Sequence, residues 1–90
     1  MSSTADAIHA FVDFVEVTDF SSPVIVAEAF GTPGRSLARA IQVFGGGDIV
    51  LLTAAGYERT LTDVGTPFFF EVEFSKVMSV TAATKVILMV

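Results

Sequence analysis

The sequence of 90 residues carries a net charge of -5 at pH 7, 52% hydrophobic residues and no cysteine. These values predict one small domain with more apolar surface than its core can bury, and they exclude disulfides and thiolate chemistry. Because the five basic residues are scattered, we expect neither nucleic acid nor a membrane surface as a partner. The longest uncharged run, Ile49 to Tyr57, is too short to span a bilayer, and the first residues show no basic stretch typical of an export signal.

The first third of the chain combines two patterns. Ile8, Phe11 and Val15 have helical spacing, whereas the segment FVDFVEVT is rich in strand-forming residues. We favour an N-terminal arm within residues 1–20 that leads into a strand at about Phe14 to Thr18. The segment SSPVIVAEAF is expected to form a further short strand, and residues 31–36 a turn.

From residue 37 onward, blocks of β-branched and aromatic residues alternate with turn residues, which is typical of an all-β sandwich or barrel. In PFFFEVEFSK, every second residue from Phe68 to Phe74 is apolar, so one face of this strand is expected to be core. The other strands are expected at Leu37 to Phe44, Asp48 to Thr53, Tyr57 to Asp63, Lys76 to Val80 and Lys85 to Val90. Short loops favour antiparallel neighbours, so residues 37–90 are predicted to form the main antiparallel sheet, a meander or Greek key with short hairpin loops, in a single domain of residues 1–90.

Three consecutive glycines, Gly45 to Gly47, precede Asp48 and raise the question of a phosphate-binding loop. A dinucleotide fingerprint needs glycines spaced as GxGxxG between a strand and a helix, whereas DIVLL continues as a strand. We therefore predict a hairpin loop in which the glycines adopt positive φ and Asp48 accepts backbone hydrogen bonds. Residues without side chains also allow close approach of another subunit, so Gly46→Val is expected to weaken assembly more than folding.

The sequence offers few groups for catalysis or metal binding. His9 is the only histidine, and we interpret it as a surface or interface residue rather than a zinc ligand or a member of a catalytic triad. Glu71 and Glu73 share a strand face about 7 Å apart, but solvated charges that keep a strand soluble explain them better than paired catalytic carboxylates do. Arg35 and Arg39 are expected to pair with acids across strands or subunits. We therefore predict no enzyme activity, no cofactor and no metal, with a hydrolase that uses the two glutamates as an open alternative.

The order of motifs from Arg35 to Val90 resembles a known family. An ARAI strand is followed by a glycine-aspartate turn into DIVLLTAAG, a TLTDV strand, a GTPF turn and SKVMSVTAATKVILMV. This order resembles the small head spike base and head decoration proteins of tailed phages and gene transfer agents, although DVGTPF stands where that family has VPAGT. The resemblance implies a small β domain that assembles as a symmetric oligomer on the capsid, supports a spike or fibre, and has no catalytic residue.

We therefore predict a non-enzymatic, homo-oligomeric structural component of a virion, soluble in the host cytoplasm before it joins the capsid exterior. Its expected partners are further copies of itself, the major capsid protein and a spike or fibre protein. The interface candidates are Gly45, Gly46, Gly47, Tyr57, Phe69 and Val90. The alternative is a carbohydrate- or small-ligand-binding β module in which Tyr57 or Phe69 lies exposed beside Glu71 and Glu73.

Overall fold

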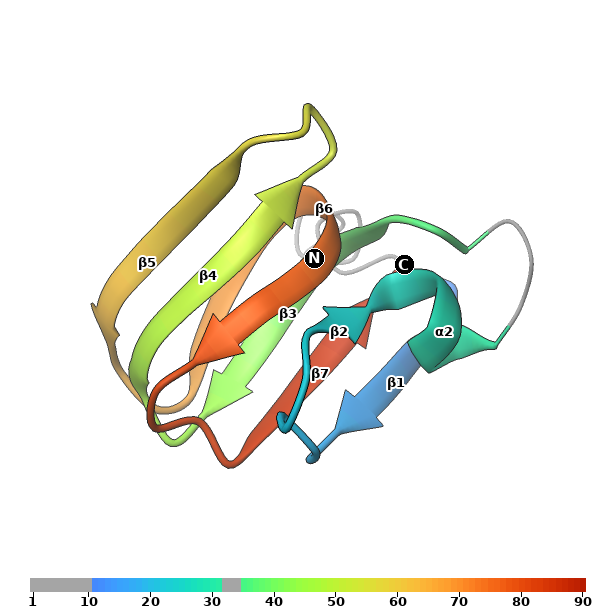
Figure 1. The fold of residues 1–90 in the computed structure, drawn as a ribbon. Coiled ribbons are helices and arrows are strands. Elements are labelled where there is room, and N and C mark those ends of the chain that lie inside the picture. Colours follow the sequence, from blue (N-terminus) through green and yellow to red (C-terminus); the bar gives the residue numbers. More distant parts are fainter. Residues whose placement is uncertain (1–10, 32–34) are drawn as a thin grey trace, which may run out of the picture.

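A computed structural model describes residues 11–31 and 35–90 of the chain. These residues form one antiparallel sheet of seven strands and one short helix (Figure 1), which confirms the predicted all-β fold. The elements are β1 (Phe14–Val17), β2 (Val24–Ile25), α2 (Val26–Phe30), β3 (Ala38–Phe44), β4 (Gly47–Thr53), β5 (Glu58–Val64), β6 (Phe68–Val80) and β7 (Lys85–Met89). The strand order is β1-β7-β3-β6-β4-β5, and β2 pairs with β6 outside this path.

The sheet folds over around β6, which is 13 residues long. The first half of β6 pairs with β3, and the second half pairs with β2 and β4. Figure 1 shows β6, in orange, bending near its middle so that its two halves lie in different layers. The first layer contains β1, β7, β3 and the first half of β6, and the second contains β2, the second half of β6, β4 and β5. Phe74 lies at the bend, fully buried, opposite Ala38 of β3 and Thr53 of β4.

The hydrophobic core lies between these two layers. It consists of Val24, Val26, Ala38, Ile41, Val43, Ile49, Leu51, Phe74, Val77, Val86, Leu88 and Val90. Phe68, Phe70 and Val72 pack against this cluster, which confirms the core face predicted for this strand. Each fully buried aliphatic or aromatic side chain stabilises the fold by about 1.5 to 3 kcal/mol. Among the described residues, no polar or charged residue is buried, so apolar packing holds the two layers together.

Two predictions about the strands are wrong. A break was expected near Lys76, but β6 runs without interruption, because its bend and the register shifts in its pairing with β4 accommodate the change of layer. The segment SSPVIVAEAF contains only the two-residue strand β2, which is followed by α2 and ended by Gly31 at φ 65. The predicted strand near residue 14 is confirmed as β1. The predicted arm at residues 1–10, His9 and turn residues 32–34 lie outside the described residues.

The prediction of a hairpin at Gly45 to Gly47 is also wrong. β3 and β4 each pair with β6 and not with each other, so the glycine turn carries the chain from one layer to the other. Of the strands described in residues 11–31 and 35–90, β4 and β5 are the only consecutive pair that are also neighbours in the sheet, which rules out a simple meander. The bend in β6 brings strand ends of both layers together, and short loops can therefore connect strands that do not pair.

Candidate functional site

Three loops meet at one end of the molecule, and we call this region the glycine corner (residues 44–48, 63–66 and 81–84). The Gly45 N–H donates to Thr66 Oγ1 at 2.9 Å. The Asp48 N–H donates to Thr81 Oγ1 at 2.8 Å, and Asp48 Oδ1 accepts from the Asp63 N–H at 2.9 Å. The prediction that Asp48 accepts a backbone hydrogen bond is thus confirmed. These bonds tie the glycine turn to both neighbouring loops.

The glycines of the corner have both unusual backbone angles and close neighbours. Gly45, Gly46 and Gly47 have φ values of 104°, 73° and 86°. A Cβ added at Gly46 would lie 2.9 Å from the Val64 carbonyl oxygen, and one added at Gly47 would lie 2.6 Å from Thr81 Oγ1. The close approach that glycine permits here is therefore made within the same chain. This geometry reverses the expectation for Gly46→Val, which should weaken folding first, while an interface role for these residues stays a prediction.

The first layer has a second side that faces away from the core and carries both apolar and charged residues, and we call it the outer face. The strand registers place ten residues on it, and the Phe11 ring lies against Phe69 of this set: Phe14, Glu16, Ala40, Gln42, Phe44, Phe69, Glu71, Lys85, Ile87 and Met89. Phe14 lies opposite Met89, and Gln42 lies between Ile87 and Phe69. Their chain neighbours Val15, Ile41, Val43, Val86 and Leu88 contribute to the core side. Because side chains alternate along a strand, the members of the outer face point away from the core.

Aromatic rings and cations extend the outer face. The rings of Phe11 and Phe69 meet edge to face, with centroids 6.3 Å apart. The Arg39 guanidinium lies 5.5 Å from the centroid of the Phe11 ring, and the Lys85 ammonium lies 4.5 Å from that of Phe44. Phe14 is 67% exposed. Phe11, Phe44 and Phe69 are half-buried, so the accessible aromatic surface of the outer face lies chiefly at Phe14, and positive charge lies above the Phe11 and Phe44 rings.

Two ion pairs lie near this face. Arg35 Nε is 3.5 Å from Asp13 Oδ2, which confirms the prediction that Arg35 pairs with an acid. Lys85 Nζ is 3.9 Å from Glu16 Oε1, which joins the neighbouring strands β7 and β1. Exposed pairs of this kind contribute at most about 1 kcal/mol each, so they orient side chains more than they stabilise the fold.

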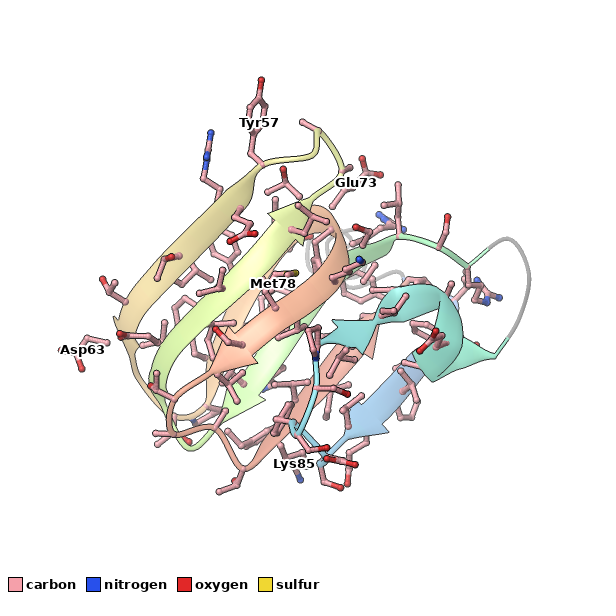
Figure 2. The ribbon with its side chains drawn as sticks, viewed as in Figure 1. Tyr57, Asp63, Glu73, Met78 and Lys85 are labelled. Carbon is pink, nitrogen blue, oxygen red and sulfur yellow. The ribbon has the colours of Figure 1, made fainter. Side chains whose placement is uncertain are left out.

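The remaining interface candidates lie apart from one another. Tyr57 is at the tip of the β4–β5 hairpin, 57% exposed, with the Arg59 guanidinium 4.8 Å from its ring centroid. Figure 2 shows the Tyr57 side chain pointing away from the body of the molecule. Phe69 belongs to the outer face of the other layer. Val90 is only 7% exposed and packs in the core of its own chain, so its side chain offers little surface to a partner.

Glu71 and Glu73 are exposed on β6, as expected for solvated charges. Phe69 is half-buried and shares the strand face of Glu71, whereas Tyr57 lies in the other layer, so the ligand-binding alternative stays a prediction. In the described part of the chain, no three histidine, aspartate or glutamate side chains form a group suited to a metal ion. The structure thus provides no assembled ligand set around the two glutamates.

A shallow hollow of about 380 Å³ lies between β1 and the segment that contains β2 and α2. Its lining includes Glu16, Asp19 and Glu28 beside Val15, Val24 and Ala29. The Ser21 backbone N–H donates to Asp19 Oδ1 at 3.0 Å, and this bond and the Ser21 hydroxyl hold the pKa of Asp19 below its usual value. The sequence did not reveal this hollow, because α2, with five residues, is too short to show a helical period.

Comparisons with protein-family models, curated proteins and solved structures found no match to this chain. The described helix has five residues, and nowhere in residues 11–31 or 35–90 is there a helix with the length and apolar character needed to cross a membrane. The case for a function therefore rests on the outer face, the glycine corner and the sheet edges.

Proposed function

We propose that this chain is a non-enzymatic structural subunit that associates with copies of itself through the outer face. The observation that supports this proposal is the exposed Phe14 beside the half-buried Met89 and Ile87, on the side of the first layer that does not contribute to the core. Exposed aromatic surface beside further apolar side chains is typical of protein interaction sites.

The composition of the outer face fits a protein partner. Interface cores are rich in aromatic residues and methionine, and their charged residues gather at the rim. Phe14 and Met89 lie side by side on neighbouring strands, and the Lys85–Glu16 pair lies toward the end of the same two strands. Burial of such apolar surface contributes about 25 cal/mol per Å² before the costs of association are subtracted.

The setting that we propose is a virion, with the subunit on the capsid exterior in contact with the major capsid protein and a spike or fibre protein. The resemblance of residues 35–90 to head spike base and head decoration proteins supports this setting. Genes for a major capsid protein or for tail proteins beside the gene for this chain would support it further. A neighbourhood of metabolic genes alone would count against it.

The self-association is tested by native mass spectrometry and analytical ultracentrifugation at micromolar concentration. We expect the wild-type chain to form an oligomer, and Phe14→Ser to weaken it by about tenfold or more, because exposed aromatic anchors dominate interface energies. Leu37→Ser is the control, since Leu37 is also an exposed apolar residue but belongs neither to the outer face nor to β5. A stable wild-type monomer contradicts the proposal, and equal effects of the two variants contradict the role of the outer face.

A further inference from the structure

The strand β5 ends the sheet and leaves one edge open. Among the residues that the structure describes, β5 pairs with β4 alone. The Thr53 N–H donates to the Tyr57 carbonyl oxygen at 2.9 Å, so Thr53 and Tyr57 form a hydrogen-bonded pair. This pair fixes which of the following pairs along β4 and β5 are hydrogen-bonded. Since bonded and non-bonded pairs alternate along an antiparallel ladder, Arg59 and Leu61 also direct their backbone groups toward β4.

The same alternation fixes what the open edge presents. Glu58, Thr60 and Thr62 direct their N–H and C=O groups away from β4, and all three residues are exposed. A row of such groups is a template for pairing with another strand. The outward N–H and C=O groups of β5 can therefore form hydrogen bonds with a second antiparallel strand whose own free groups have the same alternation.

We propose that β5 pairs antiparallel with β5 of a second copy of this chain, around a two-fold axis that passes beside Leu61. This inference rests on the proposed self-association and supplies one of its contacts. Thr60 then lies opposite Thr62 of the partner subunit, and their outward backbone groups form hydrogen bonds on both sides of the axis. Leu61 lies opposite Leu61 of the partner subunit, so two half-buried apolar side chains meet at the centre.

The charges on β5 select this register. With the axis beside Leu61, Arg59 lies opposite Asp63 of the partner subunit, and symmetry makes this pair twice. An axis beside Arg59 would instead place two guanidinium groups opposite each other, and an axis beside Asp63 would oppose two carboxylates. Opposite charges across a pair of strands stabilise it and like charges destabilise it. The mixed charges of β5 therefore disfavour those two registers and favour the one proposed.

Both charged groups are accessible at the edge. The exposed Arg59 guanidinium lies 4.8 Å from the centroid of the Tyr57 ring, and its Nη1 donates to the Glu58 carbonyl oxygen at 3.1 Å. Asp63 is exposed, has φ 53° and is held to β4 by its N–H, which donates to Asp48 Oδ1. Figure 2 shows the Asp63 side chain pointing away from the body of the molecule at the end of β5.

The test is a charge exchange between two single variants, Arg59→Glu and Asp63→Lys, measured by native mass spectrometry. For each variant alone, the dissociation constant of the β5–β5 dimer should rise by about tenfold or more, because two attractive charge pairs become repulsive. An equimolar mixture should recover pairing as a mixed species, since both contacts are then between opposite charges. Asp63→Asn is the control for the positive φ, because asparagine tolerates this backbone angle. Wild-type behaviour of both variants, or a mixture that does not recover, overturns the proposal.

Cross-linking provides a second measurement that does not depend on charge. The chain has no cysteine, so Leu61→Cys introduces a single thiol beside the proposed axis. Cα atoms of a non-hydrogen-bonded antiparallel pair lie about 4.5 Å apart, within the range of a disulfide. Leu61→Cys should therefore form a covalent dimer on mild oxidation, whereas Thr60→Cys, which is not opposite itself, should not. Equal yields from the two variants contradict the register.

The outcomes separate this inference from the proposed function. A wild-type oligomer that Phe14→Ser weakens, and that neither charge variant changes, supports the outer face and rejects the β5 contact. A wild-type monomer rejects both. Circular dichroism of each variant shows whether it is folded, and a loss of pairing counts as support only for a folded variant.

Discussion

The two ends of the molecule both depend on glycine, but for different reasons. Gly46 in the glycine corner has φ 73°, and Gly56 at the tip of the β4–β5 hairpin has φ 90°. A Cβ on Gly46 would meet the Val64 carbonyl oxygen at 2.9 Å, whereas a Cβ on Gly56 would have nothing within 4 Å. At the corner glycine is required for both space and backbone angle, and at the tip for backbone angle alone.

The hydrogen bonds show the same contrast. The tip is closed locally, by bonds from the Gly56 N–H to the Thr53 carbonyl oxygen and from the Thr53 N–H to the Tyr57 carbonyl oxygen, each 2.9 Å. The corner is held by bonds between loops that are distant in sequence, such as Asp48 to Thr81. A change at the corner should therefore affect the junction between the layers, and a change at the tip should remain local.

The largest effect is expected for Gly46→Val. The valine would combine a strained positive φ with a clash against backbone, so we expect a loss of about 3 kcal/mol or more in the free energy of unfolding. Urea denaturation followed by circular dichroism measures this loss. Gly56→Val is the matched control, because it has the same side chain and a positive φ without the clash. Equal losses for the two variants would show that crowding at the corner has no effect.

Asp48→Ala should have the next largest effect. It removes the acceptor of the Asp63 N–H, and the loss of a hydrogen bond whose acceptor residue, Asp48, is half-buried costs about 1 to 2 kcal/mol. Chemical denaturation should show this loss, with faster amide exchange at Asp63. Asp48→Asn retains an acceptor oxygen and should recover most of the stability. If asparagine is as destabilising as alanine, the charge of Asp48 and not its hydrogen bond holds the corner.

Gly56→Ala at the tip should cost about 1 kcal/mol, the usual penalty for a non-glycine residue at positive φ. Thermal unfolding measures the cost, and Gly56→Asn should reduce it because asparagine tolerates this region better. A much larger loss would mean that the tip contributes to the global fold and would remove the contrast between the two ends.

Local pattern explains what could be predicted from the sequence. The alternation from Phe68 to Phe74 depends only on the period of a strand, so the core face was predictable. The bounds of β3 and β4 were predictable to within one residue, since turn residues flank them. The bend of β6 was not, because Phe74 is placed there by pairing with Ala38 and Thr53 on two other strands.

The candidate contacts were less predictable for the same reason. Tyr57 and Phe69 were identified as interface candidates, but their separation into different layers depends on how β6 folds over. The pairing of Arg59 with Asp63 across two copies has meaning only once β5 is known to be an edge strand. Alternation predicts which side of a strand is apolar, but it does not predict which strand lies next to it.

The smallest effect is expected for Thr66→Val in the corner, and it tests whether every long-range bond there matters equally. This change removes the acceptor of the Gly45 N–H, but both residues are exposed, so water can replace the hydroxyl. We therefore expect a loss of only about 0.5 kcal/mol in the free energy of unfolding, and Thr66→Ser should restore it. A loss as large as that of Asp48→Ala would mean that the corner excludes water around Gly45 and acts as one cooperative unit. A small loss would assign its stability mainly to Asp48 and to the close packing of Gly46 and Gly47.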